Sequence, residues 1–415
     1  MDQTEALIIE TIDRHREEIL EFARDIYSHA ELGYKEFQTS GKFVKKMEQL
    51  GLRTEKGFAI TGVKAYLNED KKENASLALL GELDALRIPE HAFANPETNA
   101  AHCCGHHAQM AGVFGAALAL TVPEIAEKLD GQVVFFATPA EEYGEIEFKN
   151  QLREQGKIRY GGGKCELLRI GAFDDIDLCL THHIRPGNEI LVGSGTGNGF
   201  VSKVIRVLGK ASHAAGAPEK GVNALSAASL GLQALGLNRE TFRDEDCVRV
   251  HPIITKGGNL VNVIPDEVVV ETLVRGKTIE AFTDAAKKTD RSFKAGAIAM
   301  GAKVEISTLP GYLPTLAEEA LPELKHAAEI SASGIPVIEA SGHAGGSTDV
   351  GDVQHLMPVY TFNTGGVKGG LHQIDFEVTD EEEAYIVTAK MFALAAYGLL
   401  KEKAQRSREL VDQYE

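Results

Sequence analysis

The sequence predicts a two-domain α/β protein in which a small α+β domain interrupts a larger α/β domain. In the first half of the chain, apolar segments typical of strands alternate with helical segments. From about Gly199 the expected order changes to β-α-β-β-α-β, the order of a split βαβ unit. After Gly311 the alternation resumes and continues to a C-terminal helix. We therefore expect 1–198 and 309–415 to form one domain and 199–308 to form an inserted domain.

The larger domain should begin with an amphipathic helix, because Ile8, Ile12 and Ile19 recur at helical spacing. Strands are expected at GVKAYLNED and SLALLGELDAL, and a buried helix at MAGVFGAALALTV, ending near Pro123. Two further core strands, GQVVFFATPAEE and DIDLCLTHHIRPG, end on pairs of glutamates or histidines. Since polar residues gather at the strand ends, we expect a functional site along one edge of the sheet.

The inserted domain has its own succession of elements. Strands are expected at FVSKVIRVLGKA, CVRVHPIITKGG, VIPDEVVVETLVRG and KVEIST. Helices are expected at KGVNALSAASLGLQALG and IEAFTDAAKKTDRSFKAGAIAMGA. These elements suffice for a four-stranded sheet covered by two helices, which can stand as a separate domain.

Composition limits the classes of partner. Lys and Arg number 43 and Asp and Glu 61, so the net charge of −18 makes nucleic acid and anionic membranes poor partners. No apolar run approaches the ~20 residues of a membrane span, and the N-terminal segment lacks the basic region of a signal peptide. Without a secretory signal, the five cysteines are not expected to form a disulfide framework. We expect a cytoplasmic protein.

Two glycine-rich segments resemble phosphate-binding loops only superficially. GSGTGNG (193–199) precedes a segment that alternates like a strand, whereas a dinucleotide-binding loop is followed by a helix. GGGK (161–164) lacks the spacing and the Ser or Thr of a P-loop. We predict that both segments are turns.

Four separate segments each place Cys, His or Glu at the end of a core element. Cys104 and His106 precede the buried helix, whose N-terminus should lower the pKa of the thiol. Glu141 and Glu142 follow a strand, and one carboxylate could bind a metal while the other accepts a proton from water. The pair His182 and His183 ends another strand, and His372 follows a glycine-rich loop.

Each of these residues also has an ordinary explanation, as a buried cysteine, a solvated carboxylate or a structural histidine. Together they offer nitrogen, oxygen and sulfur donors that plausibly meet at one sheet edge. Such a mixed set suits zinc, with manganese or cobalt as alternatives.

Nine stretches of the chain, in this order, resemble the metal-dependent aminoacylase/glutamate-carboxypeptidase family over nearly the full length. The most similar group within it is that of the p-aminobenzoyl-glutamate hydrolases. The resemblance implies a zinc-peptidase-like α/β catalytic domain with an inserted ferredoxin-like lid, through which two copies of the chain form a homodimer. The stretches are YSHAELGYKE, GELDAL, CCGHHAQ, TPAEEYGE, THHIRPG, GKASHAAGAPEKGVNAL, GGNLVNVIPD, GGSTDVGDV and GGLHQIDF.

The resemblance also assigns roles to individual residues. Glu141 would be the general base and acid, and His183 is preferred over His182 because it matches the family pattern His-x-x-Pro. Asp84 would support a histidine ligand. Two divalent metal ions would be held by Cys104, His106, Glu142, His183 and His372.

Three further assignments fall in the inserted domain. His213 matches a lid histidine that reaches the neighbouring subunit's site and stabilises the transition state. Asn262 and Arg275 match positions associated with the substrate carboxylate, although Arg275 fits a surface arginine equally well.

The chain departs from the family pattern in two places. His107 stands where the family usually has Asp or Asn, and it could accept a hydrogen bond or compete as a ligand. The segment from Tyr143 to about Lys164 is longer than in common members, and it should shape the substrate pocket.

These features predict a metal-dependent amidohydrolase that cleaves an N-acyl amino acid, a p-aminobenzoyl-glutamate-like amide or a related small substrate. One alternative is a dinuclear dipeptidase, in which Glu145 and Glu147 could bind the substrate ammonium. Another is a non-catalytic, metal-stabilised scaffold or sensor, against which the intact Glu141–Glu142 pair argues.

Overall fold

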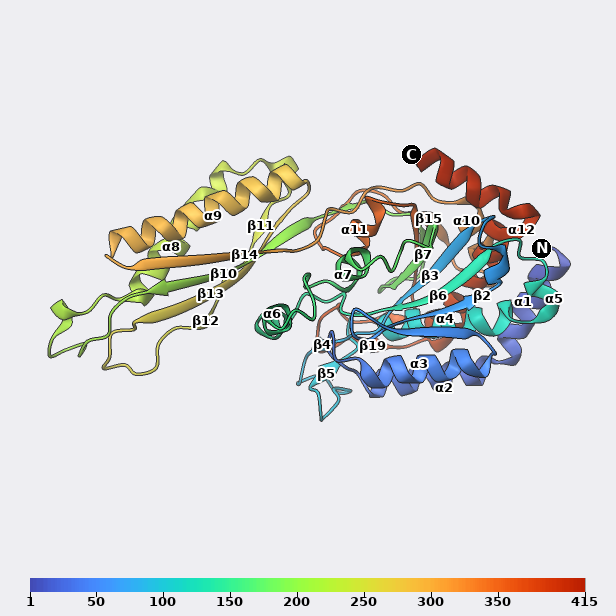
Figure 1. Ribbon diagram of the computed structural model, residues 1–415, viewed down its shortest axis with the longest axis horizontal. Helices are drawn as coiled ribbons and strands as arrows, with labels where there is room; N and C mark the ends of the chain where they lie inside the picture. The colour runs from blue at the N-terminus through green and yellow to red at the C-terminus, as the bar shows by residue number, and fades with distance from the viewer. Residues whose placement is uncertain (415) are drawn as a thin grey trace. The chain divides into compact units, whose positions relative to one another are not determined.

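The computed structural model describes residues 1–414, which form two compact units (Figure 1). The first unit comprises Met1–Gly195, Leu316–Gly342 and the chain from Asp352 onward, and the second comprises Thr196–Thr315 and His343–Gly351. The second unit thus extends beyond the expected 199–308 and takes in a return segment. This segment belongs there because β16 (His343–Ala344) pairs with β9 (Thr196–Gly197).

The first unit is built on an eight-stranded sheet with the order β1-β2-β6-β3-β7-β17-β8-β15. Its central strands β6, β3, β7 and β17 are parallel, so their carboxyl ends meet at one edge. Both β3 and β6 are buried throughout, which explains their nearly continuous apolar sequences. The strands are β1 (Arg53–Phe58), β2 (Gly62–Leu67), β3 (Ser76–Glu82), β6 (Gln132–Thr138), β7 (Leu178–Ile184), β8 (Ile190–Val192), β15 (Val337–Glu339) and β17 (Val359–Thr364).

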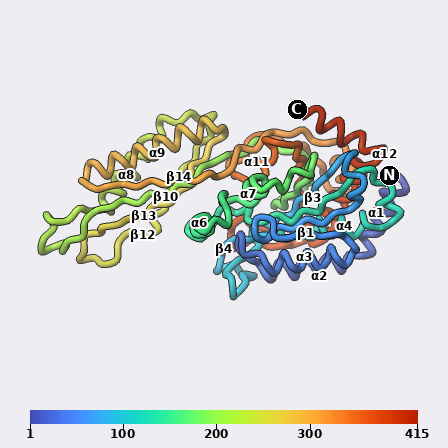
Figure 2. Tube along the Cα trace, in the orientation of Figure 1, coloured from blue at the N-terminus to red at the C-terminus, as the bar shows by residue number. Residues whose placement is uncertain are grey.

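Helix α4 (His106–Leu120) lies at the centre of this unit, and every one of its residues is buried. It contacts β3, α2 and α12. Small residues permit this packing, because a Cβ on Gly115 would lie 2.5 Å from the Cβ of Ala389. In Figure 2, α1 and α12, from the two ends of the chain, lie close together, and they are in contact. Helix α11 (Val350–Gln354) begins in the second unit and ends in the first. The other helices of the first unit are α1 (Gln3–Arg14), α2 (Arg16–Ser28), α3 (Phe37–Gln49), α5 (Pro123–Ala126), α6 (Ile146–Glu154), α7 (Gly163–Arg169), α10 (Pro322–Ser331) and α12 (Thr388–Tyr414).

The C-terminal helical stretch Glu382–Tyr414 is long and apolar enough to cross a membrane. However, 89% of its most apolar window is buried inside the fold, where it packs on α4 and α10. It begins with a π-helical turn, Glu382–Val387, and is interrupted at Lys401–Ala404. Its apolar character is therefore that of a core helix.

The second unit has the expected α+β class, with α8 and α9 packed on one antiparallel sheet (Figure 1). Its sheet has five strands rather than the expected four, because CVRVHPIITKGG forms two short strands that both pair with β13. Burial alternates along β13, with one face on the helices. The elements are β10 (Gly199–Leu208), α8 (Ala224–Asn238), β11 (Arg249–Val250), β12 (Ile253–Lys256), β13 (Glu267–Gly276), α9 (Ile279–Ala299) and β14 (Lys303–Pro310).

The two glycine-rich segments are only partly turns. Gly161 and Gly162 form a bend, but Gly163 and Lys164 begin α7. A Cβ on Gly163 would lie 1.6 Å from the carbonyl oxygen of Pro139, so glycine is required where α7 approaches the end of β6. The segment 193–199 includes β9 and enters β10 directly. The minor pairs are β4 (Leu86–Arg87) with β5 (Ala100–Ala101), and β18 (Val367–Lys368) with β19 (Glu377–Val378).

Candidate dinuclear metal site

The candidate donors of the first unit lie at the ends of core elements that share one sheet edge. Cys104 and His106 flank the start of α4, and Gly105 between them has φ 83°. A Cβ on Gly105 would lie 2.0 Å from the Ile184 side chain, so only glycine lets this segment approach β7. His372 lies between β18 and β19, and its backbone N–H donates to the Cys103 carbonyl at 2.9 Å. A backbone hydrogen bond thus joins, at the site, the segments of Cys103 and His372, which are far apart in the sequence.

Two groups of donors share Cys104. One consists of Cys104, His106 and His183, and the other of Cys104, Glu142 and His372, and in each group the ligand atoms lie within 4.8 Å of one another. Cys104 Sγ is 3.3 Å from His183 Nε2 and 3.3 Å from His372 Nε2. His372 Nε2 is 3.1 Å from Glu142 Oε1. These two groups could hold one cation each, with Cys104 as a donor to both.

Backbone and carboxylate partners orient the donors of the first group. His106 Nδ1 is 2.8 Å from the Asp84 carbonyl and 3.3 Å from Asp84 Oδ1. His183 Nδ1 is 2.7 Å from the Ile184 carbonyl. Each ring therefore turns Nε2 toward the donor group, as in metal-binding histidines. Asp84 Oδ2 also accepts from the Glu142 N–H at 2.9 Å, so Asp84 links the two groups.

Burial dominates the electrostatics of these residues. Burial and the Glu142 carboxylate raise the pKa of the Cys104 thiol, contrary to the expectation that the helix terminus would lower it. Burial lowers the pKa of His106, but the Glu82 carboxylate and Cys104 more than offset this and raise it. A protonated thiol and a protonated imidazole would both release protons when a cation binds, so metal binding should depend strongly on pH.

Glu141 is buried beside this set and does not belong to the groups that share Cys104. Its Oε2 is 3.9 Å from His106 Nε2, and it forms a third group with Glu82 and His106. The preceding residue, Ala140, has a left-handed backbone with φ 51°, which the Glu36 carboxylate stabilises by accepting its N–H at 2.8 Å. This turn lets the two adjacent glutamates, Glu141 and Glu142, join different donor groups.

His182 and His107 face the core instead. Because side chains alternate along a strand, His182 points away from His183, and its Nε2 lies 2.8 Å from Thr364 Oγ1. His107 Nε2 lies 3.1 Å from the Tyr385 hydroxyl. Burial lowers the pKa of both histidines, so both are neutral. Neither belongs to a donor group within residues 1–414.

His213, Asn262 and Arg275 lie in the second unit. His213 Nδ1 accepts from the backbone N–H groups of Ala215 and Gly216, at 3.2 Å and 2.9 Å. Asn262 is its neighbour, because the Ala214 N–H donates to the Asn262 carbonyl at 2.9 Å. Arg275 lies in β13, with its guanidinium 6.0 Å from the Phe200 ring. The structure thus brings His213 and Asn262 together.

Sequence reasoning missed Glu82, Lys164 and Glu36. Glu82 lies two residues before Asp84 in the segment GELDAL, so its position beside Asp84 could have identified it as a residue of the site. Lys164 and Glu36 reach the site from segments far away in the sequence.

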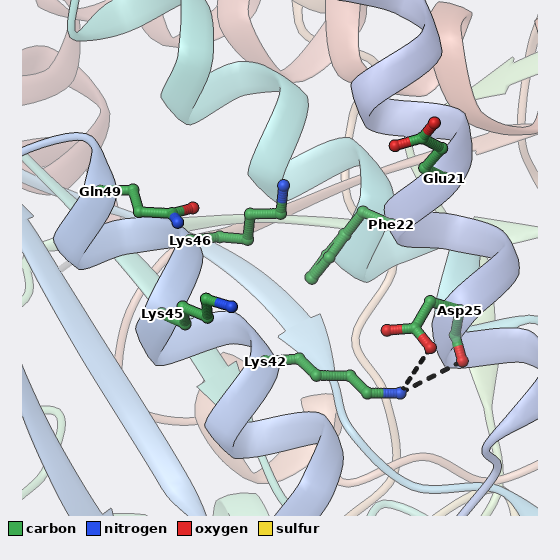
Figure 3. Close-up of a pocket in the computed structure, with 7 residues that line it drawn as sticks. All are labelled: Glu21, Phe22, Asp25, Lys42, Lys45, Lys46 and Gln49. Carbon is green, nitrogen blue, oxygen red and sulfur yellow. Dashed lines mark hydrogen bonds and ion pairs between the residues drawn. The ribbon is translucent and has the colours of Figure 1, made fainter.

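A separate pocket of about 330 Å³ lies between α2 and α3 (Figure 3). Its lining is charged, and Lys42 and Asp25 form an ion pair across it at 2.9 Å. The five predicted metal ligands do not line it. The candidate metal site is therefore defined by its donor residues and is distinct from this pocket.

An α/β sheet edge that carries two donor groups and a further carboxylate is the arrangement of a metal-dependent hydrolase. Residues 78–397 match the Peptidase family M20/M25/M40, and the chain belongs to this family. It is 27% identical to mouse (Mus musculus) Xaa-Arg dipeptidase over 408 residues, which cover 95% of this chain and 85% of that protein. It is also 27% identical to a chain of the p-aminobenzoyl-glutamate hydrolase of Escherichia coli (strain K12) over 315 residues, or 74% of this chain and 60% of the other.

Solved structures agree on the fold. A dinuclear metal binding peptidase of the M20 family from Bacillus subtilis superposes with a TM-score of 0.65 at 24% identity, over 94% of this chain and 99% of the other. An aminobenzoyl-glutamate utilization protein from Klebsiella pneumoniae gives 0.66 at 19% identity, over 95% and 98%. The predicted family and fold class are confirmed, and the chain is a hydrolase of amide or peptide bonds with a site for divalent metal ions.

Glu36 gives this region a testable dependence of stability on pH. Burial and the neighbouring Asp84 carboxylate raise the pKa of Glu36 from 4.5 to about 7. Its contribution to stability is thus fully present below pH 4.5 and is lost as the pH rises through about 7. The free energy of unfolding of Glu36→Gln, taken relative to wild type, should therefore be higher at pH 8 than at pH 5 by on the order of 1–3 kcal/mol. Thermal unfolding at both pH values measures this gain, with exposed Glu329→Gln as the control. An equal difference at both pH values would contradict the prediction.

Proposed function

We propose that the protein is a dinuclear metal-dependent amidohydrolase whose substrate is an N-acyl amino acid or a p-aminobenzoyl-glutamate-like amide. The observation that carries this proposal is the pair of donor groups that share Cys104 and have Glu141 beside them. In this proposal one ion is held by Cys104, His106 and His183, and the other by Cys104, Glu142 and His372. Zinc suits this mixture of sulfur, nitrogen and oxygen donors, with manganese or cobalt as alternatives.

The bound cations would supply Lewis acidity toward the substrate carbonyl and lower the pKa of the attacking water. Glu141 accepts the proton of this water and later gives it to the leaving amine. Asp84 keeps His106 in position through its backbone carbonyl and Glu142 through Oδ2. Asn262 and Arg275 would bind the carboxylate of the substrate.

His213 is suited to donate a hydrogen bond to the oxyanion. Since its Nδ1 accepts two backbone N–H groups, the neutral ring carries its proton on Nε2. The ring is exposed in the second unit, so Nε2–H is available to a ligand. In the proposed homodimer it acts on the active site of the neighbouring subunit.

Exposed apolar side chains on the second unit support the proposal that this unit is the dimer interface. A cytoplasmic location is part of the same proposal, consistent with the net charge of −18. The exposed residues are Leu237, Ile253, Ile254, Leu260, Val261 and Ile298.

A dipeptidase is the second candidate, because the mouse relative named above is a dipeptidase that covers nearly the whole chain. Glu145 and Glu147, which the sequence offers for binding the substrate ammonium, do not favour a dipeptidase. Both oxygens of Glu145 lie 2.9 Å from Lys35 Nζ, so this carboxylate is already neutralised. Glu147 is exposed on α6.

A hydrolysis panel tests the proposal. N-acetyl amino acids, p-aminobenzoyl-glutamate and free dipeptides are compared before and after treatment with a chelator, and again after adding zinc, manganese or cobalt. We expect turnover of the acylated substrates, its loss on chelation and its return with metal. Preference for free dipeptides would favour the second candidate. Full turnover by metal-free protein would exclude the proposed mechanism, and no turnover of any substrate by loaded protein would favour a scaffold.

His213→Ala should lower kcat more than it raises KM, because the oxyanion exists only in the transition state. Mixing inactive His213→Ala with inactive Glu141→Gln protein should produce some dimers with one intact site. Random exchange in a two-fold dimer would restore up to about a quarter of wild-type activity. No recovery despite demonstrated exchange of subunits would exclude a shared site.

A further inference from the structure

A buried ion pair lies directly behind the first donor group. Lys164 is fully buried at the start of α7, and its Nζ lies 2.5 Å from Glu82 Oε1. Glu82, at the end of β3, is only 3% exposed. Burying two charges costs free energy that well-packed apolar residues would not, so such a pair is weak support for a purely stabilising role.

The second oxygen of Glu82 faces the proposed metal site. Oε2 accepts from Gln109 Nε2 at 2.8 Å and lies 3.0 Å from His106 Nε2. The Glu82 N–H donates to Gln109 Oε1 at 2.9 Å, so the carboxylate is held from both ends. Lys164 Nζ holds the other oxygen, Oε1. The carboxylate is therefore fixed in one orientation by Lys164 and Gln109.

The contact between Glu82 and His106 joins two atoms that can both bind a metal ion. His106 Nδ1 lies 2.8 Å from the Asp84 carbonyl, which leaves Nε2 to face Glu82. Nε2 is buried and makes no hydrogen bond, although a carboxylate oxygen lies 3.0 Å away. A proton on Nε2 would join these two atoms in the metal-free protein, and a bound metal ion would replace that proton. Two atoms that are each about 2.0–2.2 Å from one ion lie roughly 3 Å apart when they occupy adjacent coordination positions.

We propose that Glu82 is a sixth protein ligand, which binds through Oε2 the ion held by Cys104, His106 and His183. This inference rests on the proposed dinuclear site. Lys164 is a positioning residue that holds Oε1, so that only Oε2 reaches the ion. The long segment 143–164 delivers this lysine, because α7 begins against the end of β6 at Gly163.

The test is a zinc titration against a competing chelator, together with visible spectra of the cobalt-substituted protein. The central variant is Glu82→Gln/Lys164→Met, which removes the carboxylate without leaving a buried ammonium unpaired. The matched control is Lys203→Met/Asp290→Asn, which removes another ion pair of a buried lysine, at 2.7 Å in the second unit.

Wild-type protein should bind two equivalents of zinc. In the central variant, one equivalent should weaken by about 10- to 100-fold, whereas the other should keep its affinity. The control should bind both as wild type does. Lys164→Met should keep both equivalents but change the cobalt spectrum, because Oε1 becomes free to coordinate.

Wild-type affinity for both equivalents in the central variant would overturn the assignment of Glu82, and so would an equal loss of both. An unchanged cobalt spectrum in Lys164→Met would overturn the role of Lys164. Failure of wild-type protein to bind zinc, manganese or cobalt would instead refute the proposed function, so the two failures are distinguishable.

Discussion

Replacing Glu141 with glutamine should lower kcat on the order of 10²-fold or more while the protein keeps its metal. Glutamine preserves the size of the side chain but cannot accept the proton of the attacking water. Glu141 lies outside the two donor groups that share Cys104, so its loss should leave these groups complete. Steady-state kinetics on the best N-acyl substrate, with metal content measured on the same samples, checks the prediction.

Glu142→Gln is the matched control, because it makes the same change one residue along the chain. Glu142 Oε1 lies 3.1 Å from His372 Nε2, so this variant should lose affinity for the ion of that group. If Glu141→Gln lost metal while Glu142→Gln stayed loaded, the two roles would have to be exchanged.

Cys104→Ala should lose both ions and reduce activity to background. Among residues 1–414, Cys104 is the only residue that belongs to both of these groups, and its Sγ is 3.3 Å from a histidine of each. In the proposed site this thiolate is a ligand of both ions, so its removal should deprive both of a ligand at once. Metal analysis after dialysis measures the loss.

Cys103→Ala provides the comparison, because Cys103 is also buried but packs in the hydrophobic core. This variant should retain both ions, even if the lost core contact lowers its stability. Retention of two ions by Cys104→Ala would contradict the bridging role, and loss of metal by both variants would point to a general packing effect.

Much of the site could be predicted from the sequence, because its donor residues lie at the ends of core strands and helices. Glu142 follows β6 and His183 lies at the end of β7, and parallel strands bring their carboxyl ends to one edge. Alternation along β7 requires that His182 and His183 face opposite ways, but it does not say which faces the site. That choice came from the resemblance, and the structure has His182 against Thr364.

The Glu82–Lys164 pair could not be predicted, because its partners lie 82 positions apart and GGGK looked like a turn. Nothing local indicates that a helix begins at Gly163 and carries Lys164 to the end of β3. The return segment 343–351 was missed for a similar reason, since its pairing with β9 depends on tertiary contacts. The pKa of Cys104 was misjudged because sequence reveals the helix terminus but not the burial of the thiol.

The most direct test of the central claim is a crystal structure of the zinc-loaded protein, with anomalous data collected at the zinc edge. Two peaks should lie roughly 3.5–4 Å apart, each about 2.3 Å from Cys104 Sγ. One should be bound by His106 and His183, and the other by Glu142 and His372. A single peak, or peaks that Cys104 does not join, would contradict the dinuclear site.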